Sequence, residues 1–267
     1  MKKVIFTVIF LLGFSASSYA VSLAGYFFQA CDDSSSAMKN APPYMLEIAH
    51  DTSQVIQQAP LCAYKFKAKQ PEKNWTVALV PLQTLSYFDD LQSSYQVVAQ
   101  ISDSSIGNND GYSSYLIVKK DSNFYSLADL ADSTILASTK VSFSTSIYPQ
   151  YVLGRFFKDN NITLLHSPSH KKELADFAAN EASAAFVNDY IVSPSELKKY
   201  RVIMAFHWLP DYLVVVNKSV VSESQASQIK HQLLNQTGRG SFSYHEPNDN
   251  LIKSYQSIIS SQTIKAD

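Results

Sequence analysis

Four hydroxyl side chains cluster between a predicted strand and a predicted helix. They belong to Ser142, Ser144, Thr145 and Ser146, in the run Ser-Phe-Ser-Thr-Ser-Ile-Tyr-Pro. The first N–H groups of a helix have no partner within it and, with the helix dipole, favour an anion. Hydroxyls add hydrogen-bond donors without adding charge, which suits a site that binds an oxyanion reversibly. Ordinary N-capping is the alternative, although it needs only one Ser or Thr; Pro149 fits either interpretation.

The familiar enzyme motifs are absent from the sequence. It has no Gly-x-Ser-x-Gly, no His-Glu-x-x-His and no glycine-rich phosphate or dinucleotide loop. His166 and His170 have helical spacing, but Pro168 lies between them, so no metal site is predicted and no cofactor is expected. A secreted hydrolase that pairs Ser169 or Ser144 with His170 stays open as an alternative, because a serine nucleophile needs an adjacent base.

Composition places the chain among folded proteins. It has 267 residues, of which 46% are hydrophobic and 17% charged, with a net charge of −1. Disordered chains are poor in apolar residues and strongly charged, so disorder as the main state is excluded. The charge balance also argues against a nucleic-acid partner, which requires a basic face.

The first residues have the pattern of a secretory signal peptide. Lys2 and Lys3 precede an apolar run, Val4–Phe14, which is followed by the small residues of Ser15–Ala20. A membrane anchor is the alternative, but the run is too short to span about 30 Å of hydrocarbon. The pattern predicts cleavage after residue 20 and a periplasmic protein that is not embedded in a membrane.

Two cysteines, Cys31 and Cys62, are the only ones in the chain. In an oxidising compartment a single pair commonly forms a disulfide. Closing this loop would stabilise the fold by roughly 3 kcal/mol in the chain-entropy model. Two buried free thiols are the alternative.

Strands alternate with helices along most of the chain, which predicts an α/β protein with mainly parallel sheets. So many strands suit two lobes better than one sheet. The predicted strands are 21–29, 61–68, 76–80, 95–101, 115–118, 134–137, 162–165, 184–187, 202–206 and 213–216. The predicted helices are 45–58, 126–130, 145–158, 171–180, 224–236 and 248–261.

Several motifs, in their order along the chain, resemble the phosphate/phosphite/phosphonate-binding proteins of ABC importers. They are the Gly-Tyr-Ser-Ser strand at 111–114, Ser-Leu-Ala-Asp-Leu at 126–130, the serine run at 142–149, Ser-His at 169–170, and Pro-Asp before the strand at 213–216. The resemblance extends from Tyr87 to Tyr255.

This resemblance implies a type II periplasmic-binding fold, in which two α/β lobes are joined by two crossing strands and a ligand lies in the cleft. Residues 21–106 and 207–267 would form the first, discontinuous lobe. Residues 107–206 would form the second lobe, which carries the anion loop.

The resemblance also implies the ligand-binding residues. Ser142 and Ser144 match the two serines of the family's anion loop, while Phe143 and Thr145 stand where the family has Thr and Gly. His170 matches a histidine of the cleft. The predicted ligand-binding residues are therefore Tyr87, Tyr112, Ser142, Phe143, Ser144, Thr145, His170 and Asp211.

Asp211 matches an acidic residue at the second crossing, which can accept a proton borne by the ligand, and Tyr112 and Tyr87 would supply aromatic rings. The function implied is a monomeric periplasmic protein that captures a small oxyanion, such as phosphate or phosphonate, for the membrane permease of an ABC importer. No chemistry on the ligand is implied. A diverged sensor or scaffold of the same fold, without a transport role, is the alternative.

Overall fold

The computed structural model describes residues 77–82, 85, 95–103, 111–140, 142–210, 212–235 and 242–261. Its strands are β1 (Val77–Pro81), β2 (Tyr95–Asp103), β3 (Tyr112–Lys119), β4 (Thr134–Ala137), β5 (Thr163–His166), β6 (Ala184–Asn188), β7 (Tyr200–Leu209), β8 (Tyr212–Asn217) and β9 (Phe242–His245). Its helices are η2 (Leu127–Leu130), η3 (Phe143–Ile147), α3 (Tyr148–Asp159), α4 (His170–Ala178), α5 (Pro194–Leu197), α6 (Glu223–Leu234) and α7 (Asp249–Ser261).

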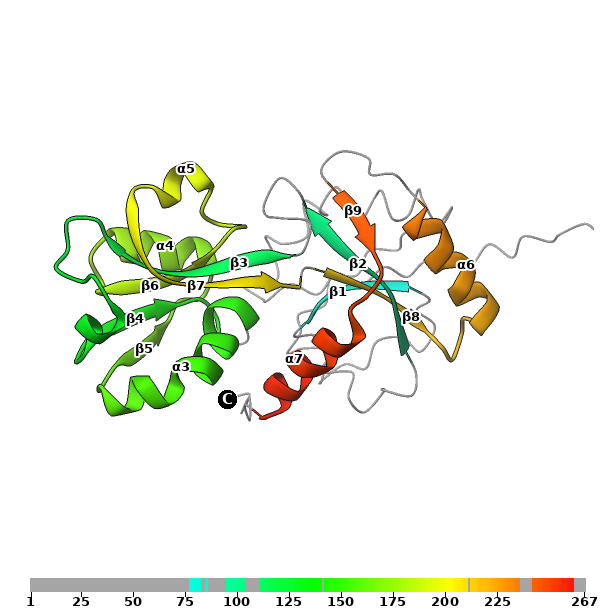
Figure 1. Cartoon of the computed structure of the whole chain (residues 1–267), viewed down its shortest axis with the longest axis horizontal. Coiled ribbons are helices and arrows are strands. Elements are labelled where there is room, and N and C mark those ends of the chain that lie inside the picture. The colour runs from blue at the N-terminus through cyan, green and yellow to red at the C-terminus, as the bar shows by residue number, and fades with distance from the viewer. Residues whose placement is uncertain are drawn as a thin grey trace, which may run out of the picture.

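The strands form two sheets, which lie side by side in Figure 1. One sheet has the order β1-β8-β2-β9 and the other the order β5-β4-β6-β3-β7. The chain passes from the first sheet to the second between β2 and β3, and returns between β7 and β8. This arrangement confirms the predicted two-lobe α/β fold. The exact lobe boundaries at 106/107 and 206/207 stay a prediction.

Strand direction differs from the sequence prediction. Among the described residues only β4 pairs in parallel, with β5 and with β6; the other pairings are antiparallel. The expectation of mainly parallel sheets is therefore wrong for this part of the chain. Its basis was the alternation of strands with helices along the chain, which does not determine the direction in which each pair of strands runs. Strands β3 and β7 connect the two sheets, and both run antiparallel to their neighbours.

Most predicted elements between residues 95 and 261 are present, and two were missed, the short helix α5 and the strand β9. The predicted strands 21–29 and 61–68 and the predicted helix 45–58 lie outside the described residues. Serine caps explain where several helices begin. Ser169, Ser193 and Ser222 each accept a hydrogen bond from an N–H in the first turn of their helix. No helix in the described ranges is long and apolar enough to cross a membrane.

The middle strand β6 is buried along its whole length because helices cover both faces of its sheet. Ala184 and Phe186 belong to the apolar cluster that includes residues of α3, while Ala185 and Val187 belong to the cluster that includes Phe177 of α4. Since alternate residues of a strand point to opposite faces, α3 and α4 lie on opposite sides of the sheet.

In a parallel sheet, the loops that follow the strands all lie at the edge where the carboxyl ends of the strands meet. Because β5, β4 and β6 run in parallel, the segments after them meet at a common edge. The segment after β4 leads to η3 and the segment after β5 leads to α4, while Asn188 is the last residue of β6. The fold therefore brings Ser142, His170 and Asn188 together, although they are far apart in the sequence.

The crossing from β2 to β3 depends on a glycine. Gly111 has φ +126°, and a Cβ atom there would lie 2.3 Å from the carbonyl oxygen of Leu209 at the end of β7. On the neighbouring strand Trp208 also has a positive φ, +59°, with 62% of the residue exposed. Both strands thus turn sharply where the chain passes between the two sheets.

We predict that Gly111→Ala destabilises the protein, because strained backbone alone costs about 1–3 kcal/mol and the clash with Leu209 adds to it. The measurement is the free energy of unfolding in urea. Gly154→Ala is the matched control: a Cβ there meets nothing within 4 Å, and alanine in a helix interior is favoured by about 1 kcal/mol. Equal stability of the two variants would contradict the assignment of strain to Gly111.

Candidate functional site

The serine run begins as a π-helical turn rather than an α-helical one. The carbonyl oxygen of Ser142 accepts from the N–H groups of Ser146 (3.1 Å) and Ile147 (2.9 Å), and Phe143 accepts from Tyr148. All four hydroxyl residues that the sequence singled out are buried. π-Turns are rare and are often found at functional sites. The turn is continuous with α3, so its first N–H groups lie at a helix N-terminus.

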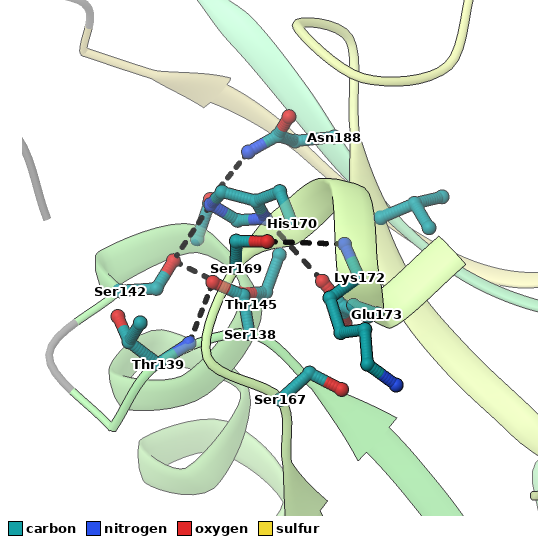
Figure 2. A network of polar contacts seen from close by, with 12 residues as sticks. Ser138, Thr139, Ser142, Thr145, Ser167, Ser169, His170, Lys172, Glu173 and Asn188 are labelled. Carbon is teal, nitrogen blue, oxygen red and sulfur yellow. Dashed lines mark hydrogen bonds and ion pairs between the residues drawn. The ribbon is translucent and has the colours of Figure 1, made fainter. Parts of the chain in front are cut away.

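Ser142 lies at the centre of a network of polar contacts (Figure 2). Its Oγ accepts a hydrogen bond from Oγ1 of Thr145 at 2.9 Å. The same Oγ lies 3.4 Å from Nε2 of His170, the first residue of α4. The structure therefore brings two predicted site residues, Ser142 and His170, into contact. Thr145, which donates this hydrogen bond to Ser142, is itself fully buried.

His170 is held from its other side by a residue that the sequence analysis did not identify. Nδ1 of His170 lies 3.3 Å from Oε2 of Glu173, one turn further along α4. Glu173 is 0% exposed, and its second oxygen, Oε1, has no hydrogen-bond partner. Burial raises the pKa of Glu173 well above its ordinary value, and burial lowers the pKa of His170 to about 4. Both shifts favour the uncharged form of the side chain.

Asn188 was also missed from the sequence. Its Nδ2 donates to Oγ of Ser144 at 3.0 Å, and the residue is only 4% exposed. Its Oδ1 is buried without a partner. The available signal was a polar residue at the end of the apolar run 184–187, because a buried amide there requires a reason. The identity of its partner depended on the fold.

The hydrogen bonds of this network leave donor protons on its hydroxyls. Ser144 accepts from Asn188, so its own hydroxyl proton is available as a donor. Ser142 accepts from Thr145, and the direction of its contact with His170 is set by the tautomer of that histidine. Together with the N–H groups of the helix N-terminus, these hydroxyls form an array of neutral donors, which is suited to an anion.

Phe143 does not contribute its ring to the donor array. The phenyl group is 1% exposed and packs against Tyr148 and Tyr255, with ring centroids 5.5 and 5.0 Å apart. Tyr148 also meets Phe206 of β7 at 5.4 Å. These four residues, the aromatic cluster, join the serine turn to α7. The side chain of Phe143 thus belongs to the core, and only its backbone can face a ligand.

Tyr112 is the other predicted site residue that the structure describes. Tyr112 packs edge-to-face on Tyr190 at 5.1 Å, and Tyr190 meets Tyr212 at 6.4 Å, so these rings gather where the chain crosses between the sheets. Tyr87 and Asp211 lie outside the described residues, as do Cys31 and Cys62 and the predicted signal peptide.

The serine–histidine pairs predicted for a hydrolase are not those that the structure forms. Ser169 caps α4 by accepting from the N–H of Lys172 at 3.1 Å, and Ser144 bonds to Asn188. Ser142 is the serine beside His170. In the described part of the chain, no group of three or more His, Cys, Asp or Glu side chains could hold a metal ion.

The same fold occurs in solved binding proteins. A Xanthomonas citri protein bound to ATP has a TM-score of 0.67 at 12% identity, over 90% of this chain and 98% of that one. PhnD1 from Prochlorococcus marinus in complex with methylphosphonate has a TM-score of 0.65 at 12% identity, with the same coverage. A binding protein component of an ABC phosphonate transporter from Pseudomonas aeruginosa has a TM-score of 0.58 at 14% identity, over 90% of this chain and 88% of that one.

These similarities define the class: a two-lobe, type II periplasmic-binding fold. A family model gives the narrower assignment. Residues 78–248, more than half of the chain, match the model described as ABC transporter, phosphonate, periplasmic substrate-binding protein, and the chain belongs to this family. A comparison with curated protein sequences found no match.

Proposed function

We propose that the protein binds a small oxyanion of the phosphonate or phosphate class at Ser142, Ser144 and the N-terminus of η3, with His170 in contact with Ser142. The observation that carries the proposal is the polarity of the network. Both serines accept a hydrogen bond from a neighbouring side chain, and the hydroxyl proton of Ser144 is then available for a ligand. The family match supports the same ligand class.

The proposed role is capture for transport rather than catalysis. A serine nucleophile needs a base that takes up its proton. Burial lowers the pKa of His170 to about 4, which makes it a weak base, and burial of the neighbouring Glu173 raises its pKa and so disfavours the carboxylate that would stabilise an imidazolium. The contact between Ser142 and His170 therefore suits ligand binding better than hydrolysis.

The proposal extends to parts of the chain outside the described residues. Residues 1–20 are proposed as a cleaved signal peptide, Cys31 and Cys62 as a disulfide, and Tyr87 and Asp211 as ligand contacts. Tyr112 is proposed to reach the ligand from the crossing. The protein would act as a monomer in the periplasm and deliver its ligand to the membrane permease of an ABC importer, through a hinge motion of the crossing strands.

The test is a thermal-shift screen of the exported protein with methylphosphonate, phosphate, phosphite, sulfate and a set of amino acids. A ligand at a hundredfold excess over Kd stabilises the native state by about 2.7 kcal/mol. We expect the midpoint to rise by roughly 5–10 °C with one oxyanion class. A cooperative melt that no oxyanion shifts would contradict the proposal and favour the sensor or scaffold alternative.

A further inference from the structure

We propose that Glu173 is a positioning residue: as a neutral carboxylic acid it donates its proton to Nδ1 of His170, which fixes the imidazole with Nε2–H directed at Ser142. This inference deepens the proposed function and rests on it for the role of the ligand. Glu173 itself touches no ligand; it acts through His170.

The geometry around Glu173 favours the uncharged acid. The side chain is 0% exposed, and in the described part of the chain His170 is its one hydrogen-bonding partner. A buried carboxylate without a cation or several donors is strongly disfavoured. Of its two oxygens only Oε2 has a partner, so the proton lies on Oε2, where it can be donated.

The position of that proton fixes the tautomer of His170. A neutral imidazole has one N–H and one acceptor nitrogen. If Nδ1 accepts from Glu173, Nε2 must carry the proton and donate toward Oγ of Ser142, 3.4 Å away. Ser142 then accepts from both His170 and Thr145, and its own hydroxyl proton has only a ligand to bond. The proton on Glu173 thus determines the direction of both hydrogen bonds, from Glu173 to His170 and from His170 to Ser142. The hydroxyl of Ser142 is then left as a donor for the ligand.

The opposite arrangement would serve a different function. An ionised Glu173 would accept Nδ1–H, Nε2 would become an acceptor, and Ser142 would donate to it. That is the geometry of a nucleophile and its base, and it would leave Ser142 without a proton for an anion. The two arrangements differ in the position of one proton, which can be measured directly.

The first experiment is ¹⁵N NMR of histidine-labelled, ligand-free protein at pH 7, with the resonances of His170 assigned by comparison with His170→Gln. We expect an unprotonated Nδ1 and a protonated Nε2, and we expect the same pattern in Glu173→Gln, whose amide can also donate. A protonated Nδ1, or an imidazolium protonated on both nitrogens, would overturn the inference. Because no ligand is present, this result does not depend on the proposed function.

The second experiment compares the pH dependence of urea unfolding in the wild type and in Glu173→Gln. Helix α4 packs on β4 and β6, which carry no titratable side chain. The titratable residues on or against it are His170, Lys171, Lys172 and Asp176 on α4, Lys119 of β3, Tyr200 of β7 and Glu181 after the helix. All of these are present in both proteins, so their contributions cancel in the ratio of unfolding constants.

Because burial raises the pKa of Glu173 in the folded state, its contribution to stability is complete below pH 4.5 and is lost as pH rises. As pH rises above 4.5, the unfolding constant of the wild type should increase relative to that of Glu173→Gln, by up to tenfold per pH unit for as long as folded Glu173 stays protonated. A constant ratio would mean that Glu173 is ionised in the native protein, and it would overturn the inference.

The third experiment measures methylphosphonate and phosphate affinities by calorimetry. Glu173→Gln should bind within about threefold of the wild type, whereas Glu173→Leu, which fills the same buried space without a donor, should lose about tenfold or more. Equal affinities for Gln and Leu would overturn the positioning role. If neither the wild type nor any variant binds either anion, the proposed function is wrong. The NMR experiment still tests the tautomer of His170, because it needs no ligand.

Discussion

Replacing Ser142 and Ser144 together by alanine is expected to lower oxyanion affinity by roughly 100- to 10,000-fold. We expect each serine to donate its hydroxyl proton to the anion, since each already accepts a hydrogen bond from Thr145 or from Asn188. A hydrogen bond to a charged group contributes about 1.5–3 kcal/mol, and each 1.4 kcal/mol is a factor of ten in Kd. Isothermal titration calorimetry with the anion selected by the thermal-shift screen measures the loss.

Ser146→Ala is the matched control for the double variant. Ser146 is buried in the same turn, but its Oγ accepts from Nε2 of Gln150 at 2.9 Å on the helix side. Its removal should change affinity by less than about threefold, since a hydrogen bond within the protein contributes about 1 kcal/mol to folding rather than to binding. A double variant that binds as tightly as the wild type would show that the site lies elsewhere.

Phe143→Ala is expected to have the largest effect on stability, a loss of about 3–5 kcal/mol. The ring is fully buried and contacts Tyr148 and Tyr255, so its removal leaves a cavity between the serine turn and α7. Aromatic pairs contribute about 0.5–1.5 kcal/mol beyond the area that they bury. The measurement is the unfolding free energy by urea titration followed by far-UV circular dichroism.

Tyr151→Ala on the following helix, α3, provides the comparison. Tyr151 is 51% exposed, and a surface substitution of this kind usually changes stability by no more than about 0.5 kcal/mol. Phe143→Leu should retain most of the buried apolar volume and lie between the two. If Phe143→Ala costs less than about 1 kcal/mol, the ring is not part of the core, and its place in the aromatic cluster is wrong.

The serine turn could be predicted from the sequence because its signal is local. Four hydroxyl residues precede a helix, and the helix itself follows from periodicity and from a proline in its first turn. His170 was predicted by resemblance to the family's Ser-His motif, and the structure brings it to Ser142. Both predictions depended on short sequence stretches at helix N-termini, where helix geometry fixes the positions of the side chains relative to the backbone N–H groups.

Glu173 and Asn188 could not be predicted in the same way. Glu173 looks like an ordinary first-turn acidic residue of a helix, and only its burial beside His170 distinguishes it. Asn188 gains its role when β6 pairs with β4 and brings it to Ser144. The prediction of strand direction was wrong for a related reason: it was inferred from the alternation of strands with helices, whereas the direction is set by the path of the chain between the two sheets.

Trp208 gives the molecule an optical signal at the junction between its sheets. The residue is 62% exposed at the end of β7, and the chain has only one other tryptophan, Trp75. Indole emission moves to shorter wavelengths when water leaves its surroundings. A rearrangement of the junction that covers Trp208 would therefore be visible in fluorescence without an attached label. Collective lobe motions take microseconds to milliseconds, so the slower ones can be followed by rapid mixing.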